Sequence, residues 1–198
     1  MLGPWYQSAD DTIDVADKEV LAQDLKMTIA YAWEMATRPI LPYDFRDSAR
    51  LIHSALEGYQ QEADQSLGLD RQRALARELE EVTGQLWQRA GALADRFTLV
   101  EHSDNLEAEA EARNIALKGL ASTLNPLLTS VVGRYGQDSY GLSALRRWVP
   151  GLADAGKLRG LDAATGDHML WWCKLIPERN RVTDDLAAAL EIARGQVR

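Results

Sequence analysis

The chain has 198 residues, with 22 Lys and Arg against 30 Asp and Glu, a formal net charge of −8; apolar residues make up 46% and charged residues 26%. This is the composition of a soluble globular protein with a sizeable core, and its acidic balance argues against nucleic acid or an anionic membrane as the main partner. No apolar run approaches the roughly 18–20 residues of a membrane span, and the single cysteine, Cys173, excludes an internal disulfide.

The first 16 residues predict an irregular arm. They are rich in turn-forming, aromatic and acidic residues and lack the basic start and apolar segment of a signal peptide. We expect this stretch to resemble the interior of a larger protein. It leaves the cellular location open.

Helical periodicity begins at Asp17, a good N-cap residue, and continues until Pro39 stops it. The link Pro39–Pro42 is expected to be extended, because residues before proline avoid the helical region. Asp44 or Asp47 then opens a second predicted helix, which ends near Gly68.

Two further helices are expected over 70–97 and 105–124, the first with a narrow apolar seam that suits antiparallel neighbours and the second interrupted at Asn125-Pro126. Glycines punctuate 129–160, so we predict an irregular excursion there with one or two short helical turns, held down by Tyr135, Tyr140 and Trp148. A last helix carries a second apolar stripe over 182–197, and Pro177 is expected to kink or split it.

No alternating strand pattern is present. The predicted fold is therefore all-α: an antiparallel helical bundle over 17–198, preceded by the arm at 1–16.

The sequence offers little self-contained chemistry. His53, His102 and His168 lie far apart, and none belongs to a metal-binding motif such as HExxH. Serine-hydrolase elbows and phosphate-binding glycine loops are also missing from the sequence. Composition and spacing alone thus predict a helical domain without its own active site.

The arm and the following helix resemble a known family. Trp5-Tyr6-Gln7-Ser8, then Asp11-Thr12, then Leu21–Leu25, are similar to the end of the catalytic domain in co-catalytic zinc exopeptidases. That family includes glutamate carboxypeptidase, many bacterial aminopeptidases and the transferrin receptor. The resemblance implies that 1–16 corresponds to the last catalytic-domain loop.

Three later matches follow in order and together extend over nearly the whole chain. Ile40–Phe45 resembles the family's link into a helical, transferrin-receptor-like dimerisation domain. Asn125–Asp138 with Pro150-Gly151-Leu152 resembles a family loop and the Pro-Gly-Leu after it. Glu178–Val182 is similar to the family's Glu-Arg-Asn-Arg-Val.

The resemblance assigns two site residues. Tyr6 matches a tyrosine that hydrogen-bonds the tetrahedral intermediate in relatives. Gln7 stands where the family has a histidine ligand to one of two zinc ions, and an amide oxygen is a poorer zinc ligand than imidazole. The family's other ligands and its general base lie on an α/β domain that the 198 residues do not contain.

The resemblance therefore implies that the chain is the C-terminal helical portion of a zinc metallopeptidase and serves dimerisation and cleft shaping. It further implies that the chain is inactive alone and that zinc is bound only in a complete enzyme. The expected partners are a second copy of the chain or an upstream catalytic domain. We also expect the apolar seams at 70–97 and 182–197, with the tryptophans near 171, to exceed what one bundle covers. The alternatives are a free-standing helical adaptor, or a pseudopeptidase that lost zinc at Gln7.

Overall fold

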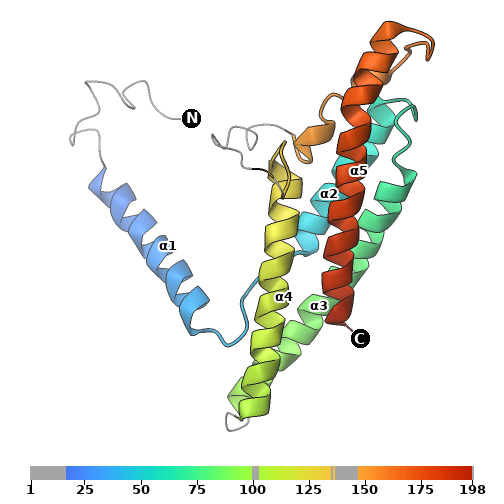
Figure 1. Ribbon diagram of the computed structural model, residues 1–198. Helices are drawn as coiled ribbons and strands as arrows, with labels where there is room; N and C mark the ends of the chain where they lie inside the picture. The colour runs from blue at the N-terminus through green and yellow to red at the C-terminus, as the bar shows by residue number, and fades with distance from the viewer. Residues whose placement is uncertain (1–16, 100–102, 135, 137–146, 198) are drawn as a thin grey trace. The chain divides into compact units, whose positions relative to one another are not determined.

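The structure, a computed structural model, describes residues 17–99, 103–134, 136 and 147–197, and these contain helices and no strand (Figure 1). The prediction of an all-α protein is therefore confirmed. The elements are α1 (Lys18–Thr37), α2 (Arg46–Glu62), α3 (Asp70–Leu99), α4 (Asp104–Thr129), α5 (Gly166–Gly195) and two short 3-10 helices, η3 (Pro150–Leu152) and η4 (Ala155–Leu158).

The chain divides into two compact units, Met1–Arg38 and Pro39–Arg198. In the first unit, α1 begins as predicted, because the Asp17 carboxylate accepts hydrogen bonds from the backbone N–H groups of Glu19 (2.8 Å) and Val20 (3.1 Å). None of the residues of α1 is buried. Its exposed large apolar side chains are Val20, Leu21, Leu25, Met27, Ile29, Tyr31 and Trp33.

The second unit is a bundle of α2 to α5 around one apolar core. In Figure 1, α2 and α4 run in one direction and α3 and α5 in the other, so chain neighbours are antiparallel while α3 and α5 lie parallel. Each helix contributes a stripe of fully buried side chains. Representative members are Ile52 and Leu56 of α2, Leu79 of α3, Leu120 of α4 and Leu186 of α5.

The second helix ends earlier than predicted, at Glu62 and not near Gly68. The cause is a left-handed turn, since Asp64 and Gln65 both have positive φ angles (49° and 68°). The Gln60 side chain stabilises this corner by accepting from the Leu69 backbone N–H at 2.8 Å. The third helix, by contrast, matches its prediction within two residues.

The prediction that Asn125-Pro126 interrupts the fourth helix is wrong, and so is a split of the last helix at Pro177, whereas a kink there stays a prediction. Helix α4 continues through Pro126 to Thr129, and α5 runs unbroken through Pro177. A proline removes one backbone hydrogen bond from a helix. Buried leucines on both sides, Leu124 and Leu127 in α4, offset that loss by packing in the core.

The irregular stretch after α4 contains the two short helical turns that were expected, η3 and η4. Its anchors differ from the prediction. Val149 and Leu152 are buried, whereas the Trp148 side chain is 45% exposed. Tyr135 and Tyr140 lie outside the described residues, as does the arm at 1–16.

The apolar seams of α3 and α5 are used inside the bundle. Leu79, Leu86 and Leu93 are buried, and so are Leu186 and Leu190. The expectation that these seams remain uncovered is therefore wrong, because α3 and α5 pack against each other. No described helix combines the length and apolar character needed to cross a bilayer.

Candidate functional site

The two residues assigned by resemblance, Tyr6 and Gln7, lie outside the described residues. Within the part of the chain that the structure describes, no three His, Cys, Asp or Glu side chains are grouped so that they could hold a metal ion. The described residues therefore do not fit a zinc site.

Three segments that carry the later motifs do meet. On α5, the Arg181 guanidinium donates to the Glu178 carboxylate, with Nη2 and Oε2 separated by 2.5 Å. Both groups lie over the Cα of Gly151, where a Cβ would collide with each of them. The Pro-Gly-Leu segment can thus approach α5 only because residue 151 has no side chain.

Gly133, four residues after the last residue of α4, packs on the same arginine. A Cβ at this position would lie 2.5 Å from Arg181 Nη1, and the backbone is left-handed, with φ +63°. Glycine is required here for both reasons. We call Gly133, Arg134, Gly151, Glu178, Arg181 and Asp185 the arginine–glycine cluster.

A fully buried carboxylate completes this cluster. Asp185 Oδ1 lies 2.9 Å from Arg134 Nε, an ion-pair distance, although the N–H is not directed at the oxygen as a hydrogen bond requires. Burial raises the pKa of Asp185, and the charges of Arg134 and Arg181 oppose this only in part. Burial likewise raises the pKa of Glu178, against the attraction of Arg181.

The chain entering the cluster is strained and held from two sides. Val149 has φ 52° and ψ 57°, a left-handed conformation that is costly for a β-branched residue. Its N–H donates to the Leu128 carbonyl at 3.0 Å, and the preceding Trp148 carbonyl accepts from the Tyr59 hydroxyl at 2.7 Å. Strain that neighbouring contacts hold in place is typical of functional sites.

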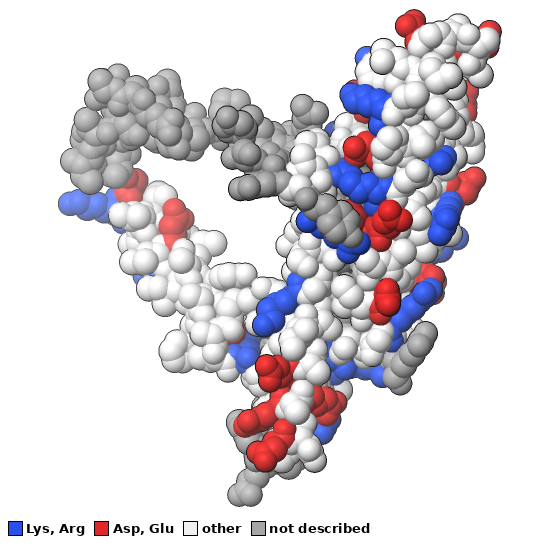
Figure 2. Space-filling model, viewed as in Figure 1, with Lys and Arg blue, Asp and Glu red and all other residues white. Residues whose placement is uncertain are grey.

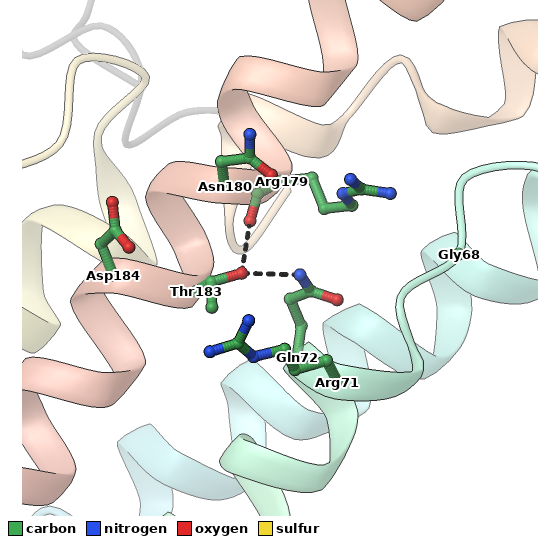
Figure 3. A pocket seen from close by; sticks show the side chains of 7 residues that line it. All are labelled: Gly68, Arg71, Gln72, Arg179, Asn180, Thr183 and Asp184. Carbon is green, nitrogen blue, oxygen red and sulfur yellow. Dashed lines mark hydrogen bonds between the residues drawn. The ribbon is translucent and has the colours of Figure 1, made fainter.

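A separate cavity of about 540 Å³ lies between the start of α3 and the middle of α5 (Figure 3). It contains two arginines, two side-chain amides and one carboxylate, and so its lining is mainly polar. The lining residues are Gly68, Arg71, Gln72, Arg179, Asn180, Thr183 and Asp184.

Surface charge adds no competing site on the face shown in Figure 2. Acidic side chains gather where α4 begins, and elsewhere on that face basic and acidic side chains are interspersed. A polyanion needs a continuous basic surface, and this face does not offer one.

Sequence reasoning singled out Gly151 and the segment Glu178–Val182 only as motifs of the resemblance, and it did not predict a site where they meet. It missed Asp185 and the buried Gln72. The available signal was position: each is a polar residue within an apolar helical stripe, Asp185 beside Val182 and Leu186, and Gln72 ahead of Leu79.

Comparisons of the chain with protein-family models, with curated proteins and with solved structures find no match.

Proposed function

We propose that this chain is the C-terminal helical portion of a zinc metallopeptidase homologue of amino- or carboxypeptidase type, that it serves dimerisation and cleft shaping, and that it is inactive by itself. The observation that carries the proposal is the meeting of Gly133, Gly151 and Arg181. These residues come from the separate segments that resemble the exopeptidase family.

The packing around Gly151 is consistent with a role in shaping a substrate cleft. The glycine lets the segment at 149–152 lie directly on the ion pair of Glu178 and Arg181, and the strain at Val149 fixes the direction in which the chain enters. A loop held this firmly can form one wall of a substrate cleft whose chemistry lies on another domain.

Helix α1 supports the proposal of an upstream partner domain. Leu25, Ile29 and Trp33 are 56%, 58% and 68% exposed, which is unusual for so many large apolar side chains on one helix of a soluble protein. An α/β catalytic domain would supply the apolar surface that they need. A free-standing adaptor would instead use α1 to bind another protein.

The proposed dimer has a different candidate surface from the one first expected. Met169 and Leu170, in the first turns of α5, are 57% and 64% exposed, while the seams of α3 and α5 are consumed in the core. We expect light scattering to report a dimer, and Leu170→Asp to convert it to a monomer. A monomer at high concentration before any substitution would contradict the pairing.

The test of the peptidase assignment has two parts. The 198-residue chain, washed with chelator, should bind no stoichiometric zinc and turn over no aminoacyl substrate. The product of the natural gene, read through any in-frame upstream region, should contain the missing His, Asp and Glu ligands. In that protein Gln7→His should tighten zinc binding by about tenfold, or roughly 1.4 kcal/mol.

Metal titration against a competing chelator separates the alternatives. If Gln7→His leaves both affinity and rate unchanged, residue 7 is not at a metal and the adaptor function replaces the peptidase function. If the natural protein hydrolyses no peptide but gains zinc with His at position 7, it is a pseudopeptidase.

A further inference from the structure

The cavity between α3 and α5 contains a buried acceptor that nothing in the described residues satisfies. Gln72 is only 4% exposed, and its Nε2 donates to the Thr183 hydroxyl at 2.6 Å. That hydroxyl donates its own proton to the Arg179 carbonyl at 3.0 Å. Thr183 can therefore only accept from Gln72, which fixes the amide orientation.

The fixed orientation leaves Gln72 Oε1 as the end without a partner. In Figure 3 it points away from Thr183, toward the side where Gly68 and the Arg179 guanidinium lie. A buried oxygen without a donor costs about 1–3 kcal/mol. A ligand that brought a donor to it would recover part of that cost.

The same cavity concentrates positive charge. Arg71 belongs to the first turn of α3 and Arg179 projects from α5. Arg179 Nη1 donates to the Leu67 carbonyl at 3.0 Å, and neither arginine forms an ion pair with a carboxylate among the described residues. Arg71 and Gln72 line the cavity, so the first turn of the 30-residue helix α3, with its partial positive charge, lies beside it, and Asp70 in that turn offsets only part of the charge. This combination favours an anionic group.

The acceptors around the cavity restrict which anion fits. Asp184 and Asn180 line it together with Gln72 Oε1, and a carboxylate beside the site disfavours a dianion such as phosphate. A singly charged carboxylate with an N–H donor next to it matches the lining, because the arginines can bind the carboxylate and Gln72 Oε1 can accept from the N–H. Arginine pairs well with carboxylates in a two-pronged geometry.

We propose that this cavity binds the α-carboxylate end of a peptide or an amino acid, with Arg71 and Arg179 holding the carboxylate and Gln72 Oε1 accepting from the adjacent N–H. Its volume of about 540 Å³ lies in the range of small-molecule sites. The proposal does not depend on the peptidase assignment, because it rests only on the described residues of α3 and α5.

The test is isothermal titration calorimetry of the 198-residue chain with four probes. N-acetylglycine carries a carboxylate and an adjacent N–H, glycine carries a carboxylate and an ammonium, acetate lacks the donor, and phosphate is the competing anion. We expect N-acetylglycine or glycine to bind at least about tenfold more tightly than acetate and phosphate. The tighter of the two identifies the source as a peptide end or a free amino acid.

Variants assign the binding to this cavity. Arg71→Gln should weaken N-acetylglycine binding at least about tenfold, and Gln72→Met should abolish the preference over acetate. Arg77→Gln is the matched control, because Arg77 lies exposed on the same helix and does not line the cavity. Circular dichroism verifies that each variant is folded.

Three results would overturn the proposal. One is equal affinity for acetate and N-acetylglycine, another is tighter binding of phosphate, and the third is an equal effect of Arg71→Gln and Arg77→Gln. Absence of measurable heat with all four probes at millimolar concentration would also reject it. Because the peptidase assignment is tested by zinc and turnover, failure of one proposal leaves the other standing.

Discussion

Helices α1 and α5 have similar caps and similar apolar periodicity, but their apolar side chains differ in burial. Both begin at a side-chain cap, Asp17 for α1 and Thr165 for α5. Apolar residues recur at helical spacing along both. Yet Leu186 and Leu190 of α5 are at most 1% exposed, whereas Leu25 of α1 is 56% exposed. Capping and periodicity therefore specify that a helix forms, and only a packing partner determines whether its apolar face stabilises the fold.

The largest expected effect lies in α5. Leu186→Ala removes a fully buried side chain from the core between α3 and α5. It should lower the free energy of unfolding by about 2–5 kcal/mol, because the cavity relaxes only partly. Urea denaturation measures this change, provided that the dependence of the free energy of unfolding on urea concentration is the same in both proteins. A loss below about 1 kcal/mol would mean that the core is more loosely packed than described.

The next effect concerns the arginine–glycine cluster. Gly151→Ala places a Cβ against the ion pair of Glu178 and Arg181, and should cost about 1–3 kcal/mol through displaced side chains. Gly84→Ala in α3 is the matched control, because nothing beyond the adjacent residues and the helix's own backbone lies within 4 Å of the added Cβ. There the substitution should stabilise the helix by about 0.5–1 kcal/mol.

Helix α3 and the contact of Gly151 with Arg181 show what the sequence could and could not predict. The long periodic stripe of α3 was sufficient to place that helix within two residues. The sequence could not show that Gly151 touches Arg181, since contacts between distant segments leave no local pattern. The resemblance to the exopeptidase family drew attention to the segments of Gly151 and Arg181 and did not predict that they meet.

Neither α4 nor α5 ends at its internal proline, for a related reason. Pro126 and Pro177 do disfavour helices locally. Leu175 and Val182, on either side of Pro177, are fully buried, so core packing holds α5 together across it. Tertiary burial outweighs a single missing hydrogen bond.

A smaller effect appears as pH dependence. Because burial raises the pKa of Asp185 in the folded state, its contribution to stability is present below the ordinary aspartate pKa of about 3.9. That contribution is lost as pH rises through the higher folded-state pKa. Asp185→Asn cannot titrate, so it should remove this loss.

The measurement is the free energy of unfolding of both proteins at a series of pH values from 3 upward. The difference, variant minus wild type, should grow as pH rises above about 4 and then level off. Glu191→Gln, at an exposed position on the same helix, is the control and should give a flat difference. A difference that shrinks with rising pH would mean that Arg134 and Arg181 outweigh the cost of burial.

The smallest effect is expected in α1 and completes the comparison. Leu25→Ala is the same chemical change as Leu186→Ala, at a position that is 56% exposed. It removes little buried area and leaves no cavity, and alanine is at least as good a helix former as leucine. The free energy of unfolding of the 198-residue chain should therefore change by less than about 0.5 kcal/mol. In the product of the natural gene, if α1 packs on an upstream domain as proposed, the same substitution should cost about 2–5 kcal/mol. Equal and negligible costs in both proteins would remove the upstream domain as the partner of α1. A cost above about 1 kcal/mol in the 198-residue chain would show that α1 already buries this leucine there.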